Sequence, residues 1–236
     1  MAIYQKFVAL NKDTHRNHKL KLITDLSFTA DLQTVPLLPT EFIEAAKEYP
    51  IVFVKSEQGT ADFQPMLLLG LAAGENLYVE ADGAWKARYV PAFIRRYPFI
   101  LAETGKDQLT LCVDSEFPGF NETEGTPLFD ANGESEFLKG MIQFVTNFHR
   151  DAQLTNAFAA KLHALDLLEE KNLKAEIKDG REFLVRGFYV VNEEKLHKLD
   201  AGKVHELFSS GELALIYAHL ISLSNLNRLV DLKAAK

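Results

Sequence analysis

The sequence predicts an α+β fold, in which a mostly antiparallel β-sheet with hairpins in the first half packs with helices concentrated in the second half. Three observations lead to this prediction. Short apolar runs at residues 51–54 and 66–71, bounded by turn residues, are typical of buried strands. The pair Asp82-Gly83 separates two further strand-like segments, as a hairpin turn does. From Ser135 onward, apolar residues recur at helical spacing instead.

Length and composition fit one soluble globular domain. At 236 residues the chain can bury a full core, and 47% hydrophobic with 25% charged residues is a usual globular composition. We therefore expect a single domain over residues 1–236, with a β-rich sub-region at 1–114 and a helix-rich sub-region with one hairpin at 134–236.

The first half is expected to hold strands at residues 3–10, 20–26, 51–54, 66–71, 77–79, 85–90, 99–102 and 109–113. Between them, Thr40 is a suitable N-cap for a helix that Pro50 ends. The hairpin turn at Asp82-Gly83 is of the kind in which both central residues have positive φ. A short helix at 91–96 then starts at Pro91 and stops before Pro98.

The second half is predicted from helical periodicity. Apolar stripes from Phe137 to Phe148 and from Leu154 to Leu168 indicate two helices packed as a hairpin near residues 149–151. A second β-hairpin turning at Asp179-Gly180 is expected next. Its strands and the short helices after it are expected at residues 173–178, 183–191, 193–199 and 203–209.

The final helix, from residue 212 to about 231, is apolar on most sides. Such a helix is buried, either in its own domain or in a homo-oligomer interface. His219 is therefore expected inside, as a neutral imidazole bonded to Ser222 or to a backbone carbonyl, because buried polar groups normally have partners.

Net charge and the single cysteine exclude several classes of protein. A formal charge of −7 argues against a broad nucleic-acid surface. Cys112 is the only cysteine, so no internal disulfide forms, and its apolar strand is unsuited to a catalytic thiolate. The N-terminus has no basic leader followed by an apolar run, and no apolar stretch reaches membrane-spanning length, so we expect a cytoplasmic protein without a membrane span.

No linear catalytic or metal motif is present. The sequence lacks a phosphate-binding glycine motif, a Gly-x-Ser-x-Gly elbow and a His-Glu-x-x-His pair, and His15 and His18 alone are too few for a zinc site. The acidic loop at 114–133 carries hard-cation ligand types without the spacing of a calcium loop; these are Asp114, Glu116, Asn121 and Glu122. We expect no metal and no cofactor, and interpret these acids as solvated or paired with arginine.

A cluster of aromatic and basic residues is the predicted ligand site. It comprises Trp85, Arg88, Tyr89, Arg95, Arg96 and Tyr97. Arginine beside aromatic rings suits a carboxylate, a phosphate, a glycan acid or an acidic protein segment. The alternative is that the arginines lock the acidic loop to the sheet. Since helical neighbours point about 100° apart, one of Arg95 and Arg96 is expected to face inward to a carboxylate and the other outward.

Several segments together resemble the bacterial SapC family over nearly the whole chain. They include Tyr49-Pro50-Ile51-Val52-Phe53, Gly74-Glu75-Asn76-Leu77, Tyr89-Val90-Pro91-Ala92, Ile94-Arg95-Arg96-Tyr97-Pro98-Phe99 and Tyr217-Ala218-His219-Leu220. The family name implies an association with a bacterial surface layer. Relatives are also similar to proteins encoded beside outer-membrane nutrient receptors and flavin-dependent halogenases, which implies an accessory role. The resemblance supplies no catalytic or binding residue.

These observations favour a non-catalytic binding or accessory protein that recognises an anionic ligand or an acidic protein segment, linked to nutrient uptake or halogenase-associated pathways. The alternatives are an enzyme whose carboxylate, histidine and arginine site is assembled from distant residues, and a surface-layer-associated structural protein.

Overall fold

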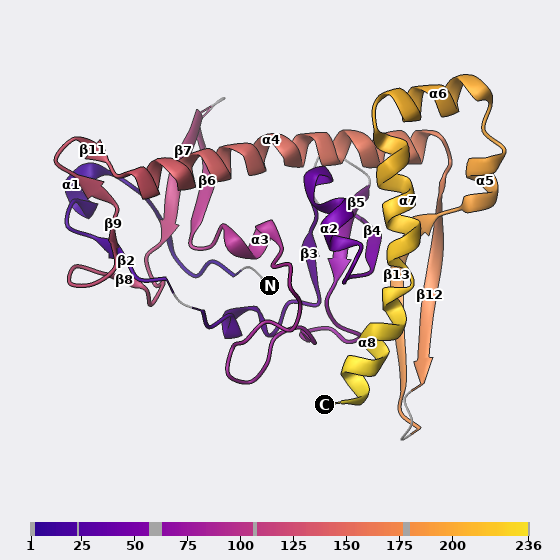
Figure 1. Cartoon of the computed structure of the whole chain (residues 1–236), viewed down its shortest axis with the longest axis horizontal. Helices are drawn as coiled ribbons and strands as arrows, with labels where there is room; N and C mark the ends of the chain where they lie inside the picture. Colours follow the sequence, from indigo (N-terminus) through magenta and orange to yellow (C-terminus); the bar gives the residue numbers. More distant parts are fainter. Residues whose placement is uncertain (1–2, 23, 57–62, 106–107, 177–179, 236) are drawn as a thin grey trace.

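The computed structural model describes residues 3–22, 24–56, 63–105, 108–176 and 180–235 (Figure 1). It has the predicted α+β architecture, with antiparallel sheets throughout the described chain and most of the helical residues in the second half. A helix of 29 residues, α4 (Glu136–Ala164), lies along one side and spans the molecule.

The larger sheet has the strand order β12-β13-β4-β5-β3 and combines strands from both halves of the chain. Their bounds are Leu168–Glu176, Glu182–Val191, Ile51–Lys55, Phe63–Leu68 and Thr34–Pro36. The apolar runs that predicted β4 and β5 are buried, as expected of strands near the centre of a sheet. The sheet packs against α4, α7 (Glu212–Ser222) and the short helix α2 (Phe42–Ala45), which together enclose the main hydrophobic core.

A second core lies under the other end of α4. It is enclosed by the sheet β1-β7-β6 and includes Phe99, Val113 and Leu138. These strands span Phe7–Ala9, Gln108–Asp114 and Phe99–Gly105. Helix α1 (Lys12–His15) and very short strands cover this end; the strands are β2 (Lys19–Leu20), β8 (Phe120–Asn121), β9 (Thr126–Pro127), β10 (Phe129–Asp130) and β11 (Gly133–Glu134).

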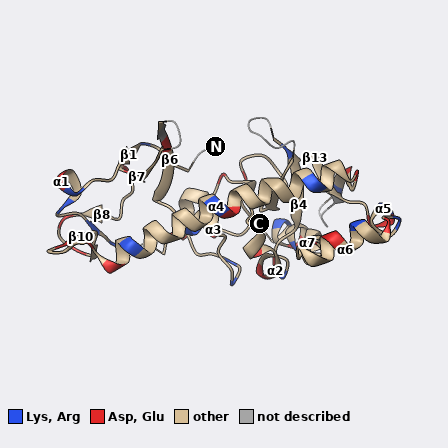
Figure 2. Ribbon diagram, turned by 90° about the horizontal axis from the view of Figure 1, so that it is seen from above, with Lys and Arg blue, Asp and Glu red and all other residues tan. Residues whose placement is uncertain are grey.

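Helix α4 corrects the prediction of a helical hairpin near residues 149–151. Its backbone is continuous through that point, and the helix runs over both cores (Figure 2). The N-cap is Ser135, whose side chain accepts a hydrogen bond from the Leu138 N–H. The two apolar stripes therefore belong to one helix that changes its packing partner along its length.

Three local predictions in the first half are wrong or hold only in part. Strand 20–26 shortens to β2. The hairpin expected from 77 to 90 pairs only near its turn, through the Val79–Trp85 bridge and the hydrogen bonds from the Glu80 N–H to the Ala84 carbonyl and from the Lys86 N–H to the Tyr78 carbonyl. Gly83 has φ 82°, but Asp82 does not have positive φ. Thr40 is not an N-cap, because the 3-10 helix η2 (Pro39–Glu41) starts after Leu38. The Leu38 N–H donates to the Glu41 carboxylate at 3.1 Å.

The remaining elements follow the prediction more closely. Helix α3 (Ala92–Arg95) starts after Pro91. The second hairpin forms from β12 and β13; Gly180 has φ 85°, and Asp179 lies outside the described residues. Short helices α5 (Glu193–His197) and α6 (Ala201–Ser209) follow. The terminal helix is divided into α7 and α8 (Asn225–Ala234), and η1 (Ser27–Thr29) is a further 3-10 turn.

His219 is fully buried, as predicted, and both of its ring nitrogens contact backbone groups. Nδ1 lies 2.9 Å from the Ile51 carbonyl, and Nε2 accepts a hydrogen bond from the Val191 N–H at 3.0 Å. Ser222 does not bond the ring; its hydroxyl donates to the His219 carbonyl and accepts from the Ile51 N–H. Burial lowers the pKa of His219 to about 4, so the imidazole is neutral at pH 7.

Candidate functional site

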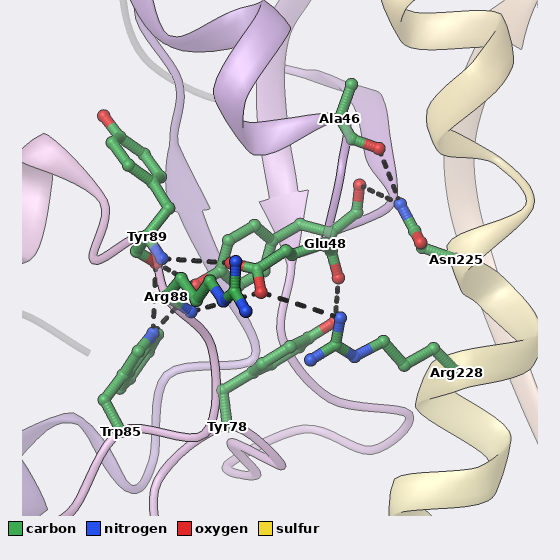
Figure 3. Close-up of polar contacts among 9 residues, drawn as sticks. Ala46, Glu48, Tyr78, Trp85, Arg88, Tyr89, Asn225 and Arg228 are labelled. Atoms are coloured by element: carbon green, nitrogen blue, oxygen red, sulfur yellow. Dashed lines mark hydrogen bonds and ion pairs between the residues drawn. The ribbon is translucent and has the colours of Figure 1, made fainter.

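The segment that carries the predicted site is held in place by the carboxylate of Glu48. One Glu48 oxygen accepts a hydrogen bond from the Arg88 N–H at 3.1 Å, and the other accepts from the Tyr89 N–H at 3.0 Å (Figure 3). These two N–H groups therefore bond a side chain 40 and 41 residues away instead of a partner strand. The Tyr78 hydroxyl donates to the Glu48 carbonyl at 2.7 Å, which ties the loop to the same point.

Helix α8 contacts this point from the other side. The Asn225 amide donates to the carbonyls of Ala46 and Tyr49 at 2.8 and 3.2 Å, and the Arg228 guanidinium lies 3.8 Å from Glu48 (Figure 3). The carbonyls at the end of α2 thus have side-chain partners, as helix ends require.

An open polar pocket of about 410 Å³ surrounds Glu48. Its lining consists of Glu44, Lys47, Glu48, Arg88, Tyr89 and Arg228. Lys47 forms an ion pair with Glu44 at 2.6 Å, so part of the positive charge is already balanced within the pocket. Arg88 is exposed, and within the described residues its guanidinium has no hydrogen bond or ion pair.

Tyr89 connects Arg95 to a buried carboxylate. Glu41 is 4% exposed, and one of its oxygens accepts hydrogen bonds from the Tyr89 hydroxyl at 2.6 Å and the Ala92 N–H at 2.7 Å. Arg95 donates from Nη2 to the Tyr89 hydroxyl at 3.2 Å and from Nε to the Val90 carbonyl at 2.8 Å. Burial raises the pKa of Tyr89 above its ordinary range, and the adjacent Glu41 carboxylate raises it further. Tyr89 therefore stays protonated and donates to Glu41.

Arg95 lies at the border of an apolar groove of about 390 Å³. The other lining residues are Leu20, Leu22, Thr24, Leu26, Phe28, Trp85, Val90, Ile94, Tyr97, Pro98 and Phe117. The Arg95 guanidinium also lies over the rings of Tyr89 and Phe144, at 5.6 and 5.2 Å from their centroids. Within the part of the chain that the structure describes, no carboxylate lies within ion-pair distance of Arg95. It is a positioned cation with donor capacity to spare.

Arg96 directly follows α3 and, being less exposed than Arg95, is the inward-facing arginine of the pair. Its guanidinium lies over the rings of Phe148, Phe93 and Tyr4, at 4.2, 4.6 and 5.8 Å from their centroids. The expected carboxylate partner is therefore replaced by aromatic rings. Neither Arg95 nor Arg96 bonds to the acidic loop at 114–133, so these arginines do not lock that loop to the sheet.

Trp85 and Tyr97 are tied to the scaffold by their polar atoms. The Trp85 indole N–H donates to the Tyr49 hydroxyl at 2.8 Å, and its ring stacks on Tyr78. Tyr97 donates to Asp114 at 3.1 Å. Both residues present their apolar surface to the groove. Of the six predicted residues, Trp85, Arg95 and Tyr97 thus line the groove, Arg88 and Tyr89 line the polar pocket, and Arg96 lines neither.

Asp114 is a structural carboxylate and not a cation ligand. It is fully buried and accepts hydrogen bonds from the N–H groups of Gln5, Lys6 and Glu116 and from the Tyr97 hydroxyl. Burial alone would raise its pKa, but these hydrogen bonds outweigh that effect and lower it. Among the described residues, no cluster of three histidine, cysteine or acidic side chains suits a metal ion.

Sequence reasoning missed Glu41, Glu48, Arg228 and Phe144, which position the site from other elements. No local pattern distinguishes these residues, because their roles depend on contacts across the fold.

Comparison with known proteins gives one match. The model of the SapC family matches residues 10–229. No curated protein and no solved structure matched the chain. Since the family model covers nearly the whole sequence, including both pockets and all six predicted site residues, the chain belongs to the SapC family.

Proposed function

We propose that this chain is a binding protein for an amphipathic anion, whose apolar part occupies the groove and whose acidic group pairs with Arg95. The observation that carries the proposal is the placement of Arg95. Two hydrogen bonds, to the Val90 carbonyl and the Tyr89 hydroxyl, hold its guanidinium at the border of an apolar cavity, with no acid of the described chain within ion-pair distance.

The groove has the size and chemistry of a small-molecule site. Such sites are usually 300–1,000 Å³, mostly apolar, with a few placed polar groups. At about 390 Å³, with Trp85, Phe28 and Phe117 among its walls, the groove fits a ligand of modest size. That size favours a small anionic molecule over an acidic protein segment. A pre-positioned guanidinium binds carboxylates with less loss of side-chain entropy than a mobile one.

The lining also favours binding over catalysis. Among the described residues, those around the groove include no carboxylate, histidine or cysteine that would act as a base or nucleophile. The wider accessory role implied by the family resemblance, and a cytoplasmic location, stay predictions that fractionation of the native host would test.

The single tryptophan gives a direct test, because Trp85 lines the groove and its fluorescence reports on occupancy. We expect sodium decanoate to change the Trp85 emission in a saturable manner, and acetate, which lacks an apolar part, to leave it unchanged. Arg95→Gln should weaken decanoate binding about tenfold or more, since a hydrogen bond to a charged group contributes roughly 1.5–3 kcal/mol. Decanol binding should be the same in Arg95→Gln and the parent.

Arg88→Gln is the matched control. It removes the same charge from the same segment, but Arg88 lines the polar pocket and not the groove. Decanoate should therefore bind this variant as it binds the parent. A parent protein whose Trp85 emission does not respond to decanoate, or equal weakening in both variants, would contradict the proposal.

A further inference from the structure

Arg96 is a largely buried cation. Its Nε is inaccessible to solvent and has no hydrogen-bond partner among the residues that the structure describes. Within the described residues, no carboxylate lies within ion-pair distance of its guanidinium. Burial lowers the pKa of Arg96, which the neighbouring Tyr4 partly opposes.

The aromatic rings around Arg96 balance only part of the cost of burying this charge. Phe148, Phe93 and Tyr4 contribute cation–π attraction, which is a modest stabilisation even at desolvated sites. Removal of a charged group from water costs more than this unless an opposite charge compensates it. An anion near Arg96 would supply that compensation.

A cavity suited to a small anion adjoins Arg96. It has a volume of about 140 Å³ and is lined by Arg96, Leu101, Val145, Phe148, His149 and Ala152. Arg96 and His149 are its polar side chains, and neither is acidic. The cavity lies against α4, away from the Arg95 groove, and shares no lining residue with that groove.

We propose that this cavity binds a small oxyanion, a carboxylate or phosphate group, through the guanidinium of Arg96. The planar fork of arginine donates two parallel hydrogen bonds to either group, and the volume limits the occupant to a few heavy atoms. Because Arg96 is the C-cap residue of α3 and His149 is on α4, the bound anion joins the end of α3 to α4. The proposal does not depend on the function assigned to the Arg95 groove.

Thermal unfolding in increasing sodium acetate and, separately, sodium phosphate tests the site. Ionic strength is held constant with a sulfonate buffer salt too large for the cavity. A ligand that binds only the native state raises Tm with the logarithm of its concentration above Kd. We expect this rise for the parent with at least one of the two anions, and the stronger response identifies the preferred oxyanion.

Two variants locate the effect. Arg96→Met removes the charge but keeps an apolar chain between the rings, and should weaken the anion response about tenfold or more. Ala152→Leu keeps Arg96 and fills the cavity, so it should abolish the response even if Arg96→Met fails to fold. Lys139→Gln, an equal charge change at an exposed position on α4, should respond as the parent does.

The result that overturns the proposal is a parent Tm that does not depend on either anion, or an anion response that persists in Ala152→Leu. The Trp85 response to decanoate should be unaffected by Ala152→Leu, which separates failure of this site from failure of the Arg95 groove.

Discussion

The His219 imidazole joins α7 to two strands of the large sheet. Its ring nitrogens bond the Ile51 carbonyl of β4 and the Val191 N–H of β13, and both bonds are buried. The N–H on Nδ1 faces the carbonyl, which leaves Nε2 as the acceptor that the Val191 N–H requires. A protonated ring would present a donor to that N–H and bury an uncompensated charge.

This arrangement predicts a loss of stability in acid. The folded-state pKa of His219 is about 4, against an ordinary value of 6.5, so below pH 6.5 the unfolded chain binds a proton that the folded chain does not. His219 therefore stabilises the fold fully above pH 6.5, and this contribution falls by about 3 kcal/mol as the pH drops to 4 and below. Urea unfolding at pH 7 and pH 4.5 measures the change.

The His219→Gln variant isolates the histidine from other titrating groups, because Gln does not titrate. Its free energy of unfolding should be lower than that of the parent at pH 7 but should fall less steeply between pH 7 and 4.5. Identical pH dependence in the two proteins would mean that His219 is not the group responsible.

Arg95 and Arg96 show how far the local sequence predicts the orientation and the partners of single side chains. Helical geometry correctly predicts that adjacent side chains diverge, and Arg95 is exposed while Arg96 is mostly buried. The partners on α4 were not predictable: Phe144 contacts Arg95 and Phe148, one turn later, contacts Arg96. Which element lies over α3 is a property of the whole fold.

Helix α4 explains why a change in apolar pattern was mistaken for a turn. Residues 149–151 include neither glycine nor proline, so the sequence has no helix breaker there. The apolar face shifts because the helix leaves the smaller core, where Val145 is buried, and enters the main core, where Phe158 is buried. Periodicity reports the direction of the packing partner, and a long helix with two partners shows two stripes.

The loop at 74–90 has a comparable explanation. Its strand-like sequence and Asp82-Gly83 turn predict a hairpin, but the N–H groups of Arg88 and Tyr89 donate to Glu48 instead of to a strand. A carboxylate that accepts two backbone bonds competes successfully with ladder pairing. The fold class and most of the strands could thus be predicted. The replacement of strand pairing by hydrogen bonds to the distant Glu48 could not.

We therefore expect Glu48 to be important for stability. Glu48→Ala leaves the two N–H groups without their partner and releases Arg228, which should cost about 1–3 kcal/mol. The Glu48 side chain is 15% exposed, so water replaces only part of the loss. Urea unfolding of the variant measures the cost.

Glu44→Ala is the control for this change. Glu44 lies four residues earlier, is 56% exposed and within the described residues forms an ion pair only with the exposed Lys47, so its loss should change stability by about 0.5 kcal/mol or less. If the two variants lose equal stability, the Glu48 contacts do not hold the segment as described.

The described residues form two large cores bridged by α4 and a smaller cluster of Leu38, Ala92 and Phe148, and the candidate site lies between the two large cores. The groove takes Leu20 and Phe117 from the smaller core and Trp85 and Ile94 from the side of the main core. Relative movement of the two cores would therefore change the width of the groove. This placement agrees with the general preference of ligand sites for boundaries between packed units.

The terminal helices leave an apolar face uncovered. The stretch Glu212–Ala234 is long and apolar enough to cross a membrane by length and composition, and 28% of its most apolar window is buried. Burial of Ile216 and His219 accounts for one side of α7, but Tyr217 and Ile221 are 42% and 67% exposed on the other. The predicted burial of this helix within its own domain therefore holds for one side of α7 only, and the predicted homo-oligomer interface would have to cover the other side.

We expect this face to pair with a second copy of the chain, because adjacent exposed apolar residues usually mark an interaction surface. Sedimentation velocity over a range of concentrations should detect a dimer, and Ile221→Asp should weaken it at least tenfold, since association would bury a charge. Leu154→Asp makes the same change at a 56% exposed position on α4 and should leave dimerisation unchanged. A parent that stays monomeric at all concentrations contradicts the prediction, and co-sedimentation of that monomer with lipid vesicles, lost in Ile221→Asp, would instead assign the face to a membrane surface.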